Sequence, residues 1–353
     1  MALSLGDCSI TLQNPFKLAN LLKPMYWIGE DNVAGEPGKV LYVILPTIGC
    51  YRYRIGKPCY MCSYPAQAPK KTSQERILSH FLEAVHKIKG KDDRFSIRIF
   101  TSGSFFDSAE VRRDTRIRIF REISKLDNVY EVVVETRSEI IREDWVRELA
   151  EMVEDKWFEV AIGLESANDD IADVSINKGS TFNDFVRASE IIHNAGAKVK
   201  TYLLLKPIFL SERDAIEDVK FSIEKAEPYT DTFSINLTNI QKGTLYESLW
   251  QRGEYRTPWL WSVVEVLRWA KKKFPHKRFL SDPVGAGSAR GPHNCGGSKD
   301  KAIERAIRKF SATQDLKFLE VEENCLEEWE YIKSEGLLDW QLLKSQVSPF
   351  SEL

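Results

Sequence analysis

The sequence predicts an α/β fold, a partial (β/α)6 barrel of the TIM type followed by a C-terminal extension. Short apolar runs rich in β-branched residues alternate with longer amphipathic stretches. The apolar runs are hydrophobic along nearly their whole length, as are strands of a parallel sheet covered by helices. Six such strand–helix units within roughly 200 residues are fewer than the eight of a closed barrel, which indicates an open version.

The first strand is expected at residues 40–45 and is followed by a loop and a helix at 73–89. The later strands are expected at 95–100, 129–135, 158–164, 198–205 and 232–237, and the later helices at 109–125, 138–154, 181–195, 212–226 and 257–274. Thr181 is suited to cap the start of its helix, and Gly196 follows its end. Pro258 is expected at the first position of the last of these helices.

Composition limits the class of protein. The 353 residues are 43% hydrophobic and 29% charged, enough apolar sequence for a large core. We expect an N-terminal segment at 1–35, the barrel at 36–280, and a C-terminal extension at 281–353. The start of the chain lacks a basic and then apolar leader, and the longest apolar run, VLYVIL, is far too short to span a bilayer. These features predict a soluble cytoplasmic protein with no membrane partner.

Charge gives only a local indication of nucleic-acid binding. Lys plus Arg number 50 and Asp plus Glu number 52, so the overall balance is neutral. Basic residues are concentrated at 271–278, at 299–310 and within 112–121, and each stretch could contact phosphate. The simpler interpretation of such runs is a solvated helix face.

Three cysteines lie close together in GCYRYRIGKPCYMCSYP (49–65), on the loop that leaves the first strand. They are Cys50, Cys59 and Cys62, and the loop holds no fourth Cys or His to complete a structural zinc site. Three thiolates suit a [4Fe-4S] cluster with one iron left for a non-protein ligand. On spacing alone, zinc binding or inert thiols remain alternatives. Cys8 and Cys325 are expected to be inert and without a partner.

Polar residues follow the ends of the other expected strands, at the edge where barrels carry their chemistry. Such residues suit the ammonium, carboxylate and hydroxyl groups of a ligand, although single ones can also be helix caps or plain turns. They are Ser102, Gly103 and Ser104; Glu135 and Arg137; Glu165 and Ser166; Lys206; and Asn236 and Asn239. A Gly-rich loop at 288–300 adds Arg290, His293 and Cys295, which could face a substrate or form a structural turn with a buried thiol.

The cysteine loop resembles that of radical S-adenosylmethionine (SAM) enzymes, and its long first gap is nearer to the Elongator branch. With FTSGSFFD, EVAIGLESAND, INKGSTF, YLLLKP, PWLWSVVEVL and RGPHNC, it resembles RaSEA, the archaeal radical SAM family of archaeosine formation. The resemblance implies a [4Fe-4S] cluster on Cys50, Cys59 and Cys62, with SAM on the open iron and an electron donor as partner. It also implies that SAM contacts come from Met61 and from the strand ends, namely Ser102, Gly103, Ser104, Glu135, Arg137, Glu165, Ser166 and Lys206.

The same resemblance implies a substrate. It is a tRNA whose D-arm carries a lysine-modified 7-deazaguanine, supplied by archaeosine synthase, and the enzyme acts as a lyase that leaves the formamidine of archaeosine. Candidate substrate contacts are Asn236, Asn239, Arg290, His293 and Cys295. Two alternatives remain: a zinc-stabilised tRNA-binding protein without radical chemistry, and another radical SAM enzyme of tRNA modification.

Overall fold

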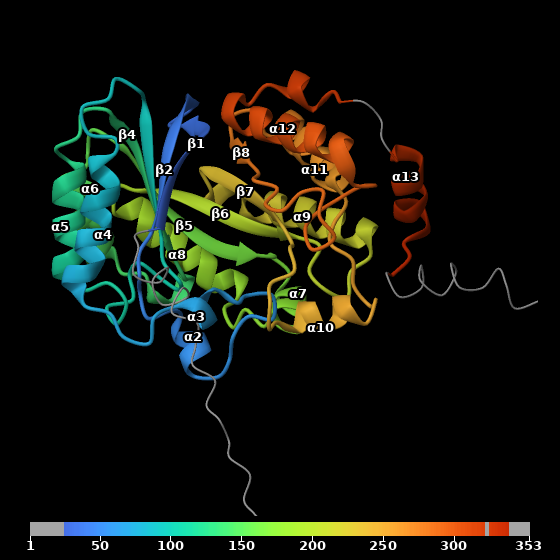
Figure 1. The fold of residues 1–353 in the computed structure, drawn as a ribbon, viewed down its shortest axis with the longest axis horizontal. Coiled ribbons are helices and arrows are strands. Elements are labelled where there is room, and N and C mark those ends of the chain that lie inside the picture. Colours follow the sequence, from blue (N-terminus) through green and yellow to red (C-terminus); the bar gives the residue numbers. More distant parts are fainter. Residues whose placement is uncertain (1–24, 322–324, 339–353) are drawn as a thin grey trace, which may run out of the picture.

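Eight strands form one curled sheet in the computed structural model, which describes residues 25–321 and 325–338 (Figure 1). The strand order is β1 to β8 in sequence; β1 is antiparallel to β2, and all other neighbours are parallel. The strands are β1 Met25–Val33, β2 Glu36–Ile44, β3 Phe95–Phe100, β4 Val129–Thr136, β5 Trp157–Glu165, β6 Lys198–Leu205, β7 Thr232–Leu237 and β8 Arg278–Leu280. The sheet is open between β1 and β8, which confirms the partial barrel.

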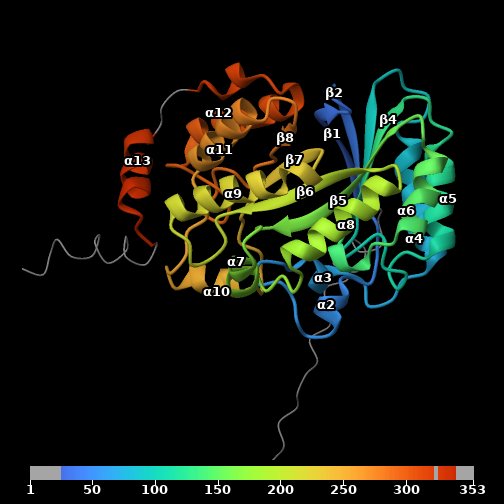
Figure 2. The ribbon, with the colours of Figure 1, turned by 180° about the vertical axis from the view of Figure 1, so that it is seen from behind.

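Helices cover the outer face of the sheet (Figures 1 and 2). They are α4 Gln74–His86, α5 Arg113–Ile123, α6 Glu143–Met152, α8 Phe182–Asn194, α9 Glu212–Ala226 and α11 Leu260–Lys273. Shorter helices lie at the carboxyl ends of the strands: α2 Tyr51–Arg54, α3 Tyr64–Gln67, α7 Asp169–Ile171 and α10 Leu245–Gln251. The C-terminal helices are α12 Gly297–Thr313 and α13 Leu326–Glu335. No described helix is long and apolar enough to cross a membrane.

The capping signals predicted both ends of α8 correctly. Thr181 caps α8 through a reciprocal pair of hydrogen bonds with Asp184, and Gly196 follows the helix with a positive φ of 85°. The expected position of Pro258 is wrong, because α11 begins two residues later, at Leu260. The Asn294 side chain, from a distant loop, accepts hydrogen bonds from the first backbone N–H groups of that helix, at Leu260 and Trp261.

The sequence did not predict β1 or β8, the two edge strands. β1 lies inside the range assigned to an N-terminal segment and pairs with β2 along its whole length. Helix α12, from the C-terminal extension, packs against β1, β2 and β8 and so occupies the opening of the barrel. It is held there by a hydrogen bond from Asn32 Nδ2 to the Ala312 carbonyl (3.0 Å) and by one from Gln314 Nε2 to the Phe279 carbonyl (2.7 Å).

A ring of buried charges crosses the interior of the barrel at the amino ends of the strands. Arg278 of β8 donates to Glu131 of β4 (2.6 Å) and to Glu159 of β5 (2.5 Å), and neither carboxylate is exposed. Its guanidinium also donates to Asn32 Oδ1 of β1 (3.1 Å), and Arg98 of β3 lies 3.8 Å from Glu131. The ring therefore connects both edges of the open sheet through side chains.

We expect Arg278→Leu to lower the free energy of unfolding by about 3–5 kcal/mol, because it leaves two buried carboxylates without their cation. Arg113→Leu is the matched control, since Arg113 pairs with Glu148 on the surface, where such a pair contributes about 0–1 kcal/mol. Urea denaturation of both variants measures the difference. Equal losses in the two variants would contradict a structural role for the ring.

Candidate active site

The three cysteines of the 49–65 loop lie at the mouth of the barrel, beside the turn that follows β3. The Cys50 backbone N–H donates to the Ser102 carbonyl (3.0 Å). Gly103 permits this close approach, because a methyl group there would lie 2.6 Å from the Cys50 backbone and 2.1 Å from a Glu110 carboxylate oxygen. The Cys62 N–H donates to the Cys59 carbonyl (3.2 Å), and all three thiols are half-buried and free.

These thiols fit a cluster better than a single ion. Burial is the main cause that raises the pKa of Cys62 to about 12, and the neighbouring sulfurs of Cys59 and Cys50 contribute to this shift, so the three groups act on one another. A zinc ion holds sulfurs at about 2.3 Å and so draws its ligands tightly together. Among the described residues, the one triad with ligand atoms within 4.8 Å is elsewhere in the chain. In a [4Fe-4S] cluster each thiolate can bind a different iron, which tolerates the wider spacing.

The cysteine loop is fastened to the segment between β5 and α8. Arg52 of α2 is buried and donates to both the backbone carbonyl (3.0 Å) and the side-chain oxygen (3.2 Å) of Asn177. Asn177 Nδ2 in turn donates to the carbonyl of Pro58, the residue before Cys59 (2.7 Å). A methyl group on Gly179 would lie 1.9 Å from the Arg52 guanidinium, so only glycine allows this packing.

Arg137 places a positive charge beside the cluster loop. Its guanidinium donates to Glu139 (2.6 Å) and to the Lys178 carbonyl (2.6 Å), and Nη1 lies 4.0 Å from the Cys59 sulfur. Burial disfavours the charged form of Arg137, but Glu139 outweighs it and the pKa is raised. The guanidinium therefore stays charged where it can stabilise a thiolate.

Two further carboxylates lie at the strand ends, Glu165 as the last residue of β5 and Glu135 near the end of β4. Glu165 is 3.1 Å from Lys178, and a methyl group on Gly163 would lie 2.6 Å from both side chains of this pair. Glu135 is half-buried; burial raises its pKa to about 7, and a hydrogen bond from Tyr202 opposes this shift. Glu135 is thus a carboxyl group that can change protonation near neutral pH.

Several predicted site residues have internal partners. The Ser104 hydroxyl is 2.6 Å from that of Thr136, and its N–H donates to Glu110. The Ser166 hydroxyl donates to buried Asp218 of α9 (2.7 Å). Lys206 forms an ion pair with Glu212 (3.0 Å), and both side chains are 1% exposed.

The remaining candidates differ in their surroundings. Asn236 and Asn239 are half-buried on β7 and just after it, while Met61 packs beside the apolar cluster around Tyr246. Arg290 donates to Glu247 (2.6 Å) and lies over the Trp250 ring, which holds the 288–300 loop against α10.

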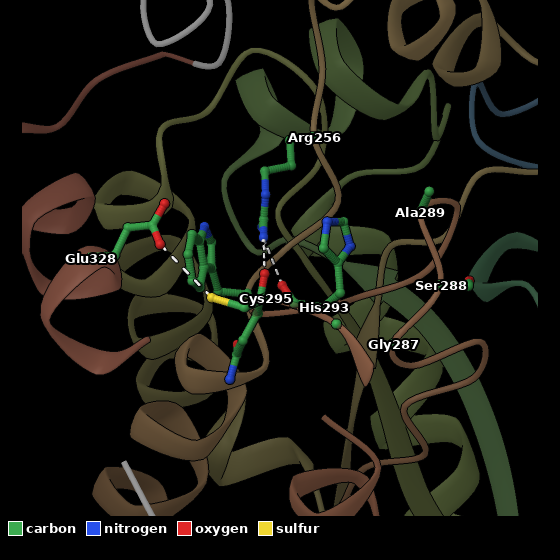
Figure 3. A pocket seen from close by; sticks show the side chains of 10 residues that line it. Arg256, Gly287, Ser288, Ala289, His293, Cys295 and Glu328 are labelled. Atoms are coloured by element: carbon green, nitrogen blue, oxygen red, sulfur yellow. Dashed lines mark hydrogen bonds between the residues drawn. The ribbon is translucent and has the colours of Figure 1, made fainter. Parts of the chain in front are cut away.

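The 288–300 loop lines a separate cavity of about 400 Å³ (Figure 3). Arg256 donates to the backbone carbonyls of His293 (2.8 Å) and Asn294 (3.0 Å), and the Glu328 carboxylate lies 3.8 Å from the Cys295 sulfur. His293 Nδ1 lies 2.8 Å from the Gly291 carbonyl, and burial lowers the pKa of the imidazole, so the ring is neutral.

The expectation that Cys325 has no partner is wrong, because it forms a disulfide with Cys295. Cys295 is exposed rather than buried, and the bond joins the 288–300 loop to the start of α13. In this state Cys295 has no S–H to donate to a substrate. Cys8 lies outside the described residues.

Sequence reasoning missed the residues that support the cysteine loop. Glu110 accepts hydrogen bonds from the Thr47 hydroxyl (2.7 Å) and the Ser104 N–H (2.7 Å) and is fully buried. Asn177 and Lys178 lie in the INKG segment. This motif resembles one of the family, but the resemblance does not show what the two residues do.

Comparison with known proteins shows the class first. The profile of the Radical SAM superfamily matches residues 44–221, and the chain belongs to that superfamily. Two solved structures share the fold, each with a TM-score of 0.50: archaeal Elp3 from Methanocaldococcus infernus (17% identical, 81% of this chain and 64% of that one) and methylornithine synthase PylB (12% identical, 83% and 85%). Radical SAM enzymes use a [4Fe-4S] cluster and SAM, so the cofactor prediction is confirmed.

The relatives then give the family. Archaeosine synthase subunit beta of Thermococcus kodakarensis is 66% identical over 320 residues, covering 90% of this chain and 99% of that protein. The protein of the same name from Methanosarcina acetivorans is 45% identical, covering 87% and 88%. The chain therefore belongs to the archaeosine synthase subunit beta family, as its resemblance to RaSEA predicted.

We expect Gly103→Ala to bind less cluster than the wild type, since the added methyl group displaces either Cys50 or Glu110. The measurement is iron and acid-labile sulfide per chain after anaerobic purification. Ser108→Ala, at an exposed position of the same loop, is the control and should retain the wild-type content. A full cluster in Gly103→Ala would show that this contact does not position Cys50.

Asp218 makes stability depend on pH, because burial raises its pKa from 3.8 to about 6. The folded state then binds the proton more tightly than the unfolded state, so the favourable contribution is complete below about pH 3.8 and is lost as the pH rises through 6. Relative to Asp218→Asn, the wild type should lose about 1–2 kcal/mol between pH 5 and 7.5 in urea denaturation. Exposed Asp173→Asn is the control, and a pH-independent difference for Asp218→Asn would contradict the assignment.

Proposed function

We propose that this protein is a radical SAM lyase of tRNA modification. Its substrate is a tRNA whose D-arm carries a 7-deazaguanine joined through its former nitrile carbon to a lysine side-chain nitrogen. The enzyme breaks the bond between that nitrogen and the lysine carbon, which leaves the formamidine of archaeosine on the base. The single observation that carries this proposal is the half-buried three-cysteine loop at the barrel mouth, in a chain 66% identical to an archaeosine synthase subunit beta.

Cys50, Cys59 and Cys62 are the residues that would hold the [4Fe-4S] cluster. With SAM bound, the cluster supplies a radical able to remove a hydrogen atom from an unactivated C–H bond, which acid–base side chains cannot do. The protein's own contribution is placement. Gly103 and Glu110 fix Cys50, Asn177 fixes the backbone before Cys59, and the Arg137 guanidinium lies 4.0 Å from the Cys59 sulfur.

The other mouth residues suit the two amino-acid groups that the site must accommodate, the methionine end of SAM and the lysine of the substrate. Each brings an ammonium and a carboxylate. Glu135, which is half-buried and lies near Lys200 and Lys178, suits an ammonium. Ser102 and Gly103 offer a turn that a carboxylate can approach closely, and Asn236 and Asn239 are suited to donate hydrogen bonds from β7.

We omit Ser104, Ser166 and Lys206 from the contact set, because their partners are other buried side chains of the protein. Glu165 and Arg137 remain candidate contacts because both border the cysteine loop. They are weaker candidates than Glu135, since each already has one ionic partner. His293 and Cys295 line the separate cavity, and Arg290 is bonded to Glu247 of α10, so we do not place these three residues at the reacting group of the substrate.

The name of the relatives supports a partner. A subunit beta implies a second subunit, and in this proposal that subunit is the archaeosine synthase that attaches lysine to the base. An external electron donor completes the reaction, because reductive activation of the cluster requires one electron from outside the chain.

Anaerobic purification tests the cofactor assignment. Wild-type protein should be brown and carry four irons and four sulfides per cluster, and it should form 5′-deoxyadenosine when SAM and dithionite are added. Cys59→Ala should lose the colour, the iron and the product, because one of the three thiolates is missing. Cys325→Ser, a cysteine far from the loop, is the control and should keep its iron.

The next measurement adds lysine-modified tRNA together with SAM and dithionite and follows the nucleosides by mass spectrometry; archaeosine should form with the wild-type protein and not with Cys59→Ala. One zinc per chain, no colour and no deoxyadenosine would contradict the radical assignment. A full cluster with deoxyadenosine formed but no archaeosine would contradict the substrate instead.

A further inference from the structure

Three aromatic rings form a ladder across β1, β2 and β3. Trp27 stacks on Tyr42, its cross-strand partner, with ring centroids 4.8 Å apart and planes inclined by 14°. Tyr42 lies in turn beside Phe100, at 6.0 Å and 15°. Trp27 is 47% exposed, so the outer face of the stack is open to solvent. An exposed tryptophan ring at the end of a parallel stack leaves apolar surface in contact with water, which is unfavourable unless another group covers it.

The ladder faces the interior of the barrel. Side chains alternate along a strand, so Trp27 projects to the same face of β1 as Asp31. Asp31 accepts a hydrogen bond from Arg98 (2.5 Å), which belongs to the ring of buried charges and also lies over the Tyr42 ring. Trp27 is therefore an interior-facing side chain that remains exposed because β1 is the open edge of the sheet.

The inner end of the ladder reaches the cysteine loop. Phe100 is the last residue of β3, and the turn that follows it contains Ser102, whose carbonyl accepts the Cys50 N–H. The stack thus runs from the open edge of the barrel to the turn that supports the first cysteine. A planar group placed on Trp27 would lie at the entrance to the proposed reaction site.

Helix α12 places cations along this entrance. Lys301, Arg305 and Arg308 are spaced by four and three residues, so they share one face of the helix, and all three are exposed. Arg308 pairs with Asp282 (2.6 Å). Helix α12 packs against β1, the strand that carries Trp27.

An exposed aromatic face beside a line of cations is typical of proteins that bind single-stranded nucleic acid. Every base presents a π-face, and the cations track its backbone phosphates. A base inside a duplex cannot reach a site within a barrel, so it must leave the stack, and an aromatic platform offsets part of the lost stacking energy.

We propose that Trp27 is a stacking platform for an unpaired base of the substrate tRNA, with Lys301 and Arg305 contacting the adjacent phosphates. This inference rests on the proposed function, because it takes tRNA as the substrate. It adds the entrance route, which passes the exposed Trp27 side chain of β1, the strand against which α12 packs, and does not lead through the 400 Å³ cavity beside Cys295.

Trp27→Ala in the full chain with its cluster should weaken binding of lysine-modified tRNA about ten-fold, measured by fluorescence anisotropy. Trp27→Phe should keep most of the affinity, since a smaller ring still stacks. Phe221→Ala is the matched control, because Phe221 is 46% exposed on α9, outside the sheet. Iron content and deoxyadenosine formation without tRNA should equal those of the wild type in all three variants.

The salt dependence separates the two contacts. Lys301→Ala with Arg305→Ala should reduce the slope of log Kd against log salt by about 2, one for each phosphate contact, whereas Trp27→Ala should leave the slope unchanged. If Trp27→Ala binds the tRNA with wild-type affinity, the proposal that Trp27 is a stacking platform is wrong. The lyase assignment is unaffected by this result if archaeosine still forms. Retained tRNA affinity together with a loss of thermal stability or of binding to the partner subunit would also overturn the proposal. In that case the Trp27 indole would contact residues 1–24 or another protein, and not a base.

Discussion

The connection between the two edge strands of the open sheet, β1 and β8, depends on the Arg278 guanidinium. β1 and β8 share no backbone hydrogen bonds, yet Arg278 reaches Asn32, 246 residues earlier, as well as Glu131 and Glu159 in the middle of the sheet. Buried charges are stable only when each has a partner of opposite sign. The ring therefore fixes how the strands are arranged relative to one another. Burial lowers the pKa of Lys200, which lies against this ring, to about 8, a sign of how little water reaches that end of the barrel. The polar interior leaves the opposite end, at the carboxyl ends of the strands, as the place where ligands can enter.

The strands and helices were predictable from periodicity because their apolar faces are regular. Strands at 95–100, 198–205 and 232–237 have the expected limits, and the others differ by a few residues. The edge strands β1 and β8 were not predictable, because the side chains that give them their role in the fold interrupt the apolar pattern. β1 reads MYWIGEDNV because its inner side chains enter the charged ring and the aromatic ladder, and β8 has only three residues, one of them Arg278. A strand that faces a polar interior does not have the apolar pattern by which strands are recognised.

The candidate site was predictable in position but not in orientation. Parallel strands bring their carboxyl ends together, so polar residues after them had to converge. Which way each side chain points depends on backbone that periodicity does not describe. Glu165, the last residue of β5, and Lys206, the first residue after β6, have positive φ angles of 66° and 60°, a conformation that non-glycine residues adopt rarely. Glu165 thereby meets Lys178, whereas Lys206 is turned to Glu212 beneath α11. The Cys295–Cys325 bond was likewise beyond sequence reasoning, since spacing does not determine which cysteines pair.

The eight residues between Cys50 and Cys59 form a long gap that contacts at both ends keep ordered. A flexible loop of this length would leave the first two thiols poorly placed relative to one another, and ordering them would cost conformational entropy. Here each end has its own anchor: Cys50 is bonded to the turn after β3, and Pro58 is bonded to Asn177, after β5. Between them α2 directs the buried Arg52 to the same Asn177, whose left-handed φ of 56° ends a π-helical turn at Ala172–Ile176. The two ends of the loop are therefore positioned by the turn after β3 and by the segment between β5 and α8, and the loop needs only to reach from one anchor to the other.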